Sequence, residues 1–362
     1  MFLGHISEYR MRLVSYRARC GDAFHLKYVG NSGKIRNIFL DMGHAKTYDV
    51  VLKNVVTNLV NASEKIDALF LSHIHNDHIG GAVEFIKDAK NDIKLKNAAE
   101  HWIYNAPRRY EIDKEENEKG GLLCSVAFGD IVYEYIKTYF PLDVMDYVAG
   151  DSFDIDGMKV SLLSPDIDKL SQLTAKYSNN RPLCKSESDE ISTEAGGVTD
   201  DYSIPLKSFE TDSFEEDSSI ENASSIAAIF EFDGKRILWL ADAIPSVIIQ
   251  SLSNMGFSES NKMHCDSVLL SHHGSALNNS SKLFRMISAE KFFFSADGVN
   301  KYCLPNKSVV ARIVASVANF PVDLYFNYCD GRLPRMFLEE NSIEIGEMLK
   351  VHYLGNCEAV EI

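Results

Sequence analysis

One short segment of this sequence concentrates the residue types that are best suited to chemistry. It spans residues 69–81, LFLSHIHNDHIGG, and places His73, His75, Asp77 and His78 directly after an apolar run. Alternation along an extended chain puts His73 and His75 on one side, and a helix that follows would bring Asp77 and His78 round behind them. Imidazole and carboxylate groups this close together suit zinc, manganese or iron. The spacing therefore predicts a site for one or two metal ions.

Two further segments end in polar residues of the same kind. His272 and His273 follow an apolar run in residues 267–275, SVLLSHHGS, and Asp242 ends the apolar run 237–241. An aspartate in such a setting is costly to bury unless it binds a metal, caps a helix or accepts hydrogen bonds. Capping of a helix that begins at Pro245 is the alternative interpretation of Asp242. The presence of two histidine groups favours metal binding.

These segments need a scaffold that positions them, and the remaining sequence predicts one. Short apolar runs alternate with amphipathic segments, which is typical of a layered α/β architecture. Asp233 and Gly234, between two apolar runs, predict a hairpin turn. The expected strands are 23–29, 37–41, 68–72, 158–163, 225–232, 236–241, 267–271, 291–295 and 324–328. The expected helices include 48–60, 81–88, 124–139, 245–255, 280–287 and 307–318.

Length and charge limit how the chain is organised. Its 362 residues allow one large unit or two ordinary domains, and 37 basic against 52 acidic residues give a net charge of −15. Such a charge repels polyanions on average. The stretch 184–221 holds twelve of the acids and two lysines, so the rest of the chain carries a net charge of only −5. This stretch is rich in serine and threonine and has no periodicity, so we expect a flexible insertion or, alternatively, a docking segment for a partner protein.

The cysteines and the apolar runs bear on the compartment. The seven cysteines are odd in number, scattered and never spaced as Cys-x-x-Cys, which favours reduced thiols over a disulfide framework. No apolar run approaches the ~18 residues needed to span a bilayer, and the first residues lack the pattern of a signal peptide. We therefore expect a cytoplasmic protein without a membrane partner.

Taken in order, the motifs resemble the metallo-β-lactamase superfamily, and within it most closely the ComEC-like hydrolases. The segments that carry the resemblance are 21–24, 38–43, 71–81, 222–228, 240–243 and 271–275. The resemblance implies a four-layer αββα sandwich that spans 1–362 as a single domain, with 184–221 as an insertion within it. It also implies a site for two divalent metal ions, zinc being favoured over manganese.

The same resemblance implies a role for each matching residue. The implied roles are His73 and His75 at the first metal, Asp77, His78 and His273 at the second, Asp242 as the bridge, and Asp41 orienting a histidine ligand from behind. His272 would contact the substrate, and Asp77 or Asp242 would take a proton during attack by a metal-bound hydroxide.

Two departures from the family pattern affect the first metal. Most relatives supply a third histidine from a Gly-His turn, but this chain has none between His101 and His264. Asn222 is the expected substitute, as a weak ligand or as a holder of water, and the first site would then be weakly occupied. His101 is the other candidate, although its neighbours indicate a strand edge or a packed surface. Leu304 stands where the resemblance favours a histidine before Pro305.

The resemblance implies a metal-dependent hydrolase, and the His-His-Gly motif at 272–274 favours a phosphodiesterase or nuclease. One alternative is a hydrolase of a small ester, lactone or thioester, which the acidic surface tolerates more readily. A second alternative is a catalytically silent metal-binding subunit that docks on a partner through residues 184–221.

Overall fold

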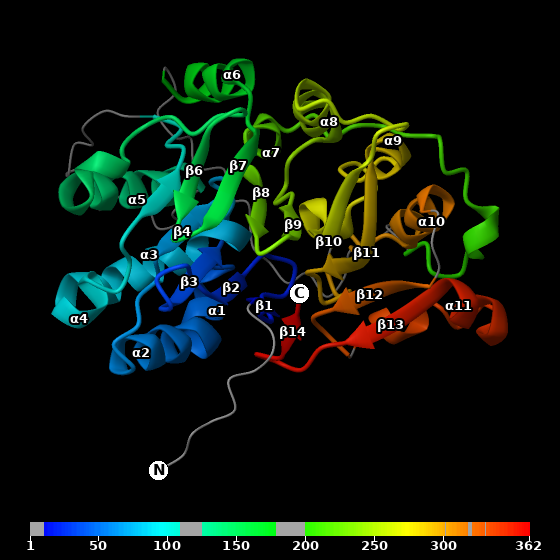
Figure 1. Ribbon diagram of the computed structural model, residues 1–362, viewed down its shortest axis with the longest axis horizontal. Helices are drawn as coiled ribbons and strands as arrows, with labels where there is room; N and C mark the ends of the chain where they lie inside the picture. The colour runs from blue at the N-terminus through cyan, green and yellow to red at the C-terminus, as the bar shows by residue number, and fades with distance from the viewer. Residues whose placement is uncertain (1–10, 109–124, 179–199, 301, 318–320, 330) are drawn as a thin grey trace, which may run out of the picture.

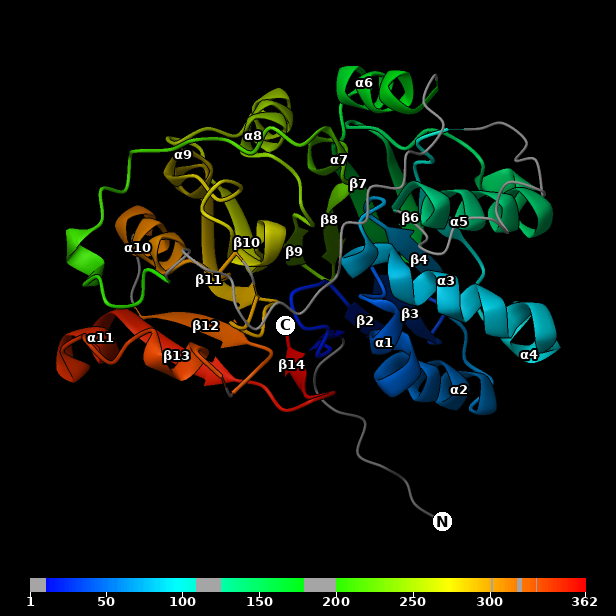
Figure 2. The same ribbon diagram turned by 180° about the vertical axis from the view of Figure 1, so that it is seen from behind.

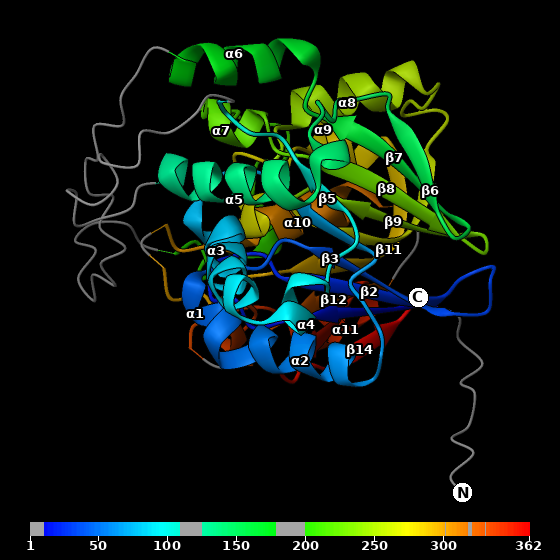
Figure 3. The same cartoon turned by 90° about the vertical axis from the view of Figure 1, so that its left-hand side faces the viewer.

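Two β-sheets packed face to face form the centre of the molecule, and helices cover both outer sides (Figures 1 and 3). The computed structural model describes residues 11–108, 125–178, 200–300, 302–317, 321–329 and 331–362. The first sheet has the order β14-β1-β2-β3-β4-β5, and the second has the order β13-β12-β11-β10-β9-β8-β7-β6. This arrangement confirms the predicted four-layer αββα architecture.

The first sheet and its helices come mainly from the N-terminal part of the chain. Its strands are β1 (Met11–Ser15), β2 (Phe24–Val29), β3 (Ile35–Leu40), β4 (Ala68–Leu71), β5 (Trp102–Tyr104) and β14 (Ala359–Glu361). The helices of this part are α1 (Ala45–Thr47), α2 (Lys53–Asn61), α3 (Asn76–Asn91), α4 (Ile93–Lys96) and α5 (Ser125–Tyr139). Strands β3, β4 and β5 run parallel, so their carboxyl ends lie at one edge of the sheet.

The second sheet is larger and also has a parallel part. Its strands are β6 (Ser152–Ile155), β7 (Met158–Ser164), β8 (Ala227–Phe232), β9 (Lys235–Trp239), β10 (Met263–Leu269), β11 (Ile287–Phe294), β12 (Val322–Phe326) and β13 (Leu349–Tyr353). The remaining helices are α6 (Ile167–Ser178), α7 (Ile220–Ala223), α8 (Pro245–Asn254), α9 (Ser281–Arg285), α10 (Lys307–Ser316) and α11 (Ser342–Met348). The run from β9 to β13 is parallel, while β8 and β9 form the predicted hairpin, with Asp233 and Gly234 at positive φ in the turn.

Alternation along each strand divides the apolar residues among three layers of core. In β4, Phe70 points between the sheets, where its ring lies 5.3 Å from that of Phe230 and 6.0 Å from that of Trp239. Leu69 and Leu71 point outward and pack under the helices of the first sheet. A strand that is buried on both faces reads as a continuous apolar run, which is why the sequence revealed it.

All nine strands expected from the sequence overlap an observed strand, and five observed strands were not expected. Four of these, β5, β6, β13 and β14, are the outer strands of the two sheets, and β1 lies between β14 and β2. Strand β6 alternates polar and apolar residues, none of which is buried, so it leaves a weak signal in the sequence. Strand β5 is apolar and buried but only three residues long.

Residues 200–219 of the acidic stretch, here named the strap, run alongside α9 and α10 (Figure 2). Asp201 accepts hydrogen bonds from the backbone N–H groups of Lys307 and Ser308 at the start of α10, at 2.7 and 2.9 Å. Glu216 accepts from the backbone N–H and the hydroxyl of Ser246 at the start of α8, at 2.8 and 2.7 Å. Acids at helix N-termini are stabilising because they satisfy free N–H groups and complement the helix dipole.

Several expectations concern residues or properties that the structure does not describe. Residues 184–199 of the expected insertion, Cys124 and Cys184 lie outside the described residues, and the division into one domain with an insertion stays a prediction. The five described cysteines are free. None of the helices in the described part of the chain has the length and apolar character that a membrane crossing requires.

Candidate metal centre

Both sheets deliver polar residues to one edge of the sandwich. Asp41 follows β3, His73 follows β4, Asp242 follows β9, and His272 and His273 follow β10. Asp41, His272 and His273 have φ of 57°, 47° and 55°, in the left-handed region. Such conformations cost roughly 1–3 kcal/mol each in residues other than glycine and gather at functional sites. The backbone thus bends sharply where the strands end, and these bends bring the side chains together.

Helix α3 supplies the second half of the first motif. The helix begins at Asn76, so Asp77 and His78 lie in its first turn, while His75 occupies the N-cap position with extended backbone. Gly81 allows the helix to approach the loop after β3, because a Cβ atom at this position would lie 2.1 Å from the backbone oxygen of Met42. This close approach holds α3 beside Asp41.

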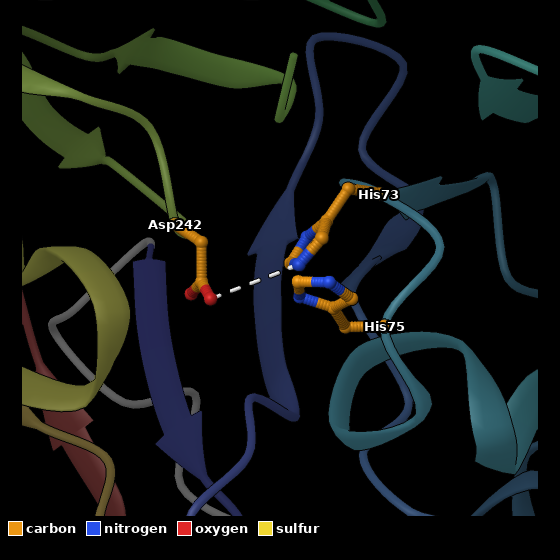
Figure 4. A group of neighbouring side chains, drawn as sticks. All are labelled: His73, His75 and Asp242. Carbon is orange, nitrogen blue, oxygen red and sulfur yellow. Dashed lines mark ion pairs between the residues drawn. The ribbon is translucent and has the colours of Figure 1, made fainter. Parts of the chain in front are cut away.

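His73, His75 and Asp242 form a first group of potential ligands. Figure 4 shows the two imidazole rings side by side and facing the Asp242 carboxylate across the gap between the sheets. The potential ligand atoms of the three residues lie within 4.8 Å of one another, and His73 Nε2 is 3.7 Å from Asp242 Oδ2.

Asp77, His78 and His273 form a second group, again with ligand atoms within 4.8 Å. Asp77 Oδ2 lies 3.2 Å from His273 Nε2 and 3.8 Å from His78 Nε2. Asp242 reaches this group through its other oxygen, since Oδ1 is 3.2 Å from His78 Nε2 and 3.9 Å from His273 Nε2. Two ligand atoms about 2.1 Å from one tetrahedral zinc lie roughly 3.4 Å apart, so these separations match those of shared ligands.

Groups behind the histidines orient their rings. His78 Nδ1 lies 2.7 Å from Asp41 Oδ2, His273 Nδ1 lies 3.2 Å from Asp22 Oδ1, and His73 Nδ1 lies 3.0 Å from Ser72 Oγ. A carboxylate can only accept, so the Nδ1 atoms of His78 and His273 carry protons and donate them. The Nε2 atoms of both rings therefore face the interior of the site, as metal ligands require.

The charges of the site are strongly coupled. Burial alone would raise the pKa of Asp242, but His272, His78 and His273 outweigh this effect and hold its pKa well below the usual range. Burial and the neighbouring His78 and His75 hold the pKa of His73 well below its usual range. Asp242 is therefore a carboxylate and His73 a neutral imidazole at neutral pH. Burial alone would lower the pKa of His78 and His273, but the neighbouring carboxylates outweigh this effect and raise the pKa well above its usual range, so metal binding at these two residues releases protons.

The residues present fit a divalent metal, because several buried polar atoms of the site have no hydrogen-bond partner. These atoms are His73 Nε2, His78 Nε2, both carboxylate oxygens of Asp242 and Asn222 Oδ1. Leaving such atoms unpaired inside a protein is costly. Nitrogen and oxygen donors in this number suit zinc and manganese.

The other predicted residues lie at different distances from the centre. His272 borders it, with Nε2 3.6 Å from Asp242 Oδ2. Asn222 lies in α7 beside His272, its Nδ2 atom 3.4 Å from His272 Nδ1. His101 is apart from the site, since its side chain is 65% exposed and pairs with Asp143. Leu304 is buried and offers no polar group.

Three residues of the site were not found from the sequence: Asp22, Asp217 and Asn278. Asp22 is buried and contacts His273, and its only signal was an acid within the family-like segment 21–24. Asp217 and Asn278 both contact His272 or its partners. Neither stands next to an apolar strand, so nothing in the sequence marked them.

Comparison with known proteins supports the fold. Residues 41–166 match the family model of the metallo-beta-lactamase superfamily, and the two sheets with their outer helices are consistent with the metallo-β-lactamase fold. Among solved structures, the chain is similar to the metallo-beta-lactamase fold protein YhfI from Bacillus subtilis, with 12% identity over 97% of this chain and 99% of that chain and a TM-score of 0.42. It is also similar to a diphosphatase from the PhnP family, with 14% identity over 86% of this chain and 94% of that chain and a TM-score of 0.40. No curated protein sequence matches this chain.

Proposed function

We propose that this chain, with its metallo-β-lactamase fold, is a ComEC-like metal-dependent hydrolase that holds two divalent ions, zinc or manganese, and cleaves phosphodiesters. The position of the Asp242 carboxylate carries the proposal. Its Oδ2 lies 3.7 Å from a histidine of the first group, and its Oδ1 lies 3.2 Å from a histidine of the second. One carboxylate shared between two groups of ligands supports a bridged pair of ions.

The proposed ligand set follows this division. His73 and His75 hold the first ion, Asp77, His78 and His273 hold the second, and Asp242 bridges the two. Asp41 and Asp22 keep the Nε2 atoms of His78 and His273 turned toward the ions.

The exposed fractions of the side chains support a direction of approach for the substrate. Asp77 and His272 are 26% and 24% exposed, whereas Asp242 and His78 are at most 1% exposed. Divalent ions, when bound here, would lower the pKa of water and neutralise charge that develops on the substrate. Asp77, whose side chain is partly exposed, is placed to accept the proton of the attacking water. His272 is placed to contact the anionic group of the substrate.

The His-His-Gly motif at 272–274 supports the phosphodiester as substrate, and a nuclease is the specific form of this proposal. The second candidate, a small ester, lactone or thioester, is supported by the charge around the centre. Within the described residues, the polar contacts of the six proposed ligands involve aspartate, histidine, serine and asparagine and no lysine or arginine. Binding of a long polyanion would depend on the metal ions and His272.

Hydrolysis assays with matched histidine variants test the proposal. The purified chain, loaded with zinc or manganese, is incubated with DNA, RNA, bis(p-nitrophenyl) phosphate, chromogenic esters and lactones. We expect phosphodiester cleavage that His75→Ala reduces by a factor of at least about 100, as typical of general acid–base groups and ligands, while His101→Ala leaves it unchanged.

The outcomes separate the candidates. Cleavage of esters or lactones without phosphodiesters would favour the second candidate. If the metal-loaded chain cleaves none of these substrates, or if His75→Ala cleaves them as well as the unaltered chain, the proposed hydrolase is refuted.

A further inference from the structure

Asp217, near the end of the strap, connects two amide side chains at the edge of the metal centre. Its Oδ1 accepts a hydrogen bond from the backbone N–H of Ser219 at 2.9 Å. Its Oδ2 accepts from Asn222 Nδ2 at 2.6 Å and from Asn278 Nδ2 at 3.2 Å. The side chain of Asp217 is only 13% exposed. One carboxylate therefore contacts the nitrogen atoms of two amides and helps to fix which way they face.

The orientation of Asn278 follows from its partners. Besides Asp217, its Nδ2 donates to the backbone oxygen of Asp242 at 3.1 Å. Both partners can only accept, so the amide nitrogen must face them and the amide oxygen must face the other way. Asn278 Oδ1 lies 2.9 Å from His272 Nδ1.

The neighbours of His272 Nδ1 favour one tautomer. Asn278 Oδ1 at 2.9 Å and Asp217 Oδ2 at 3.5 Å only accept hydrogen bonds, whereas Asn222 Nδ2, a donor, is 3.4 Å away. The shortest contact is with an acceptor, so a neutral His272 carries its proton on Nδ1. Its Nε2, 3.6 Å from Asp242 Oδ2, then presents a lone pair to the centre. Asn222 is held in the same manner, because Asp217 binds its nitrogen and leaves Oδ1 buried without a hydrogen-bond partner.

We infer that Asp217 is a positioning residue of the metal centre, which orients the amides of Asn222 and Asn278 and, through Asn278, selects the Nδ1–H tautomer of His272. The inference deepens the proposed function and rests on it only in taking His272 to face the substrate. Because Asp217 belongs to the acidic stretch, that stretch contributes to the centre and not to the surface alone.

The substitution Asp217→Asn replaces one acceptor oxygen by a donor NH₂ group in a side chain of nearly the same shape. The backbone N–H of Ser219 cannot turn, so the one oxygen that the substituted side chain retains stays with it, and the new NH₂ group faces the amides of Asn222 and Asn278. Asn222 can flip to present oxygen, but a flip of Asn278 would also set its oxygen against the backbone oxygen of Asp242. Either orientation of Asn278 therefore has one unfavourable contact, and Asn278 no longer prefers a single orientation. In its flipped orientation it offers NH₂ to His272 Nδ1, which can accept only if the ring proton moves to Nε2.

The test reads the tautomer directly. Long-range proton–nitrogen NMR correlations of the full chain, with isotope-labelled histidine, show which ring nitrogen of His272 carries the proton at a pH where the ring is neutral. The spectra are recorded without metal and with zinc, and His272→Gln assigns the signals. Glu216→Gln is the matched control, since Glu216 is the preceding acid of the strap and contacts Ser246 in α8.

We expect the proton on Nδ1 in the unaltered chain and in Glu216→Gln, and a measurable population with the proton on Nε2 in Asp217→Asn. Phosphodiester cleavage by Asp217→Asn should fall by about 10- to 100-fold, as for other partners behind a metal centre. A proton on Nε2 in the unaltered chain overturns the inference, even if Asp217→Asn does not fold. If Asp217→Asn folds and its His272 still carries the proton on Nδ1 alone, the inference is also overturned. Absence of any hydrolysis refutes the proposed function instead, because the tautomer is measured independently of activity.

Discussion

Asp41→Asn tests whether Asp41, at the end of β3, orients the proposed metal ligand His78. Asp41 Oδ1 accepts from the backbone N–H of Ser72, and Oδ2 accepts from the Ser72 hydroxyl and from His78 Nδ1, each at 2.7 Å. The backbone N–H of Ser72 cannot reverse, so the amide oxygen of the substituted side chain stays with it. The NH₂ group then faces His78 Nδ1, which drives the ring proton to Nε2 and removes the lone pair from the centre.

The expected losses of metal affinity and of folding stability can both be estimated. Loss of an outer partner of a ligand weakens metal binding by about 10- to 100-fold, or about 1.4–2.7 kcal/mol. Loss of one hydrogen bond to a charged group costs about 1.5–3 kcal/mol of folding stability. Unfolding of a chain of 362 residues has an entropy of about 0.76 kcal/mol/K, so the Tm of the metal-free protein should fall by about 2–4 °C.

Zinc affinity is measured by competition with a chelator, and stability by thermal unfolding of the metal-free protein. Asp67→Asn is the control, because Asp67 is buried at the other end of the same strand pair. Its Oδ2 accepts from the backbone N–H of Asn37 at 2.6 Å and its Oδ1 from Arg36 Nη1 at 2.7 Å. Asp67→Asn should lower the Tm to a similar extent and leave zinc affinity unchanged. Wild-type zinc affinity in Asp41→Asn, or equal losses of affinity in both variants, would refute the role assigned to Asp41.

Three other predictions concern stability. Burial lowers the pKa of His25 from 6.5 to about 4, so the folded state is favoured above pH 6.5 and loses about 3 kcal/mol of this stability as the pH falls toward 4. Urea titrations at both pH values should show this loss in the unaltered chain but not in His25→Gln. Equal losses of unfolding free energy in the two proteins would contradict the prediction. Gly274 has φ of +83°, and a Cβ atom there would lie 2.7 Å from the Phe294 ring, so Gly274→Ala should cost about 2–5 kcal/mol of unfolding free energy. Gly256→Ala, at φ +89° with open space around it, should cost only about 1–2 kcal/mol. If Gly274→Ala and Gly256→Ala lose the same unfolding free energy, the contact with the Phe294 ring is unimportant. Lys307 is buried and lies 2.7 Å from Glu340, which also accepts from the backbone N–H of Leu206. Lys307→Met should cost about 3–5 kcal/mol by leaving that carboxylate without a counter-charge, and a further Glu340→Gln substitution should restore part of the loss in the same denaturation assay.

Much of the centre could be predicted from residues 69–81 because the information there is local. A buried strand, a short extended link and a helix start place His73, His75, Asp77 and His78 around one point, and each of these steps depends on neighbouring residues only. The expected strands were found for the same reason, because an apolar run is a local signal. The outer strand β6 was missed because its polar and apolar residues alternate and none is buried, and β5 because it is only three residues long.

Contacts between residues that are far apart in the chain could be found only from the tertiary structure. The sequence by itself determined the types of ligand, the strand ends that carry them and the helix that completes the first motif. Only the closure of the two sheets decided that Asp242 lies between the two ligand groups, that Asp22 supports His273 and that Asp217 reaches the amides beside His272. The physical reason is that hydrogen bonds between side chains depend on position to within tenths of an ångström, and residues far apart in the chain acquire such positions only when the whole sandwich has packed.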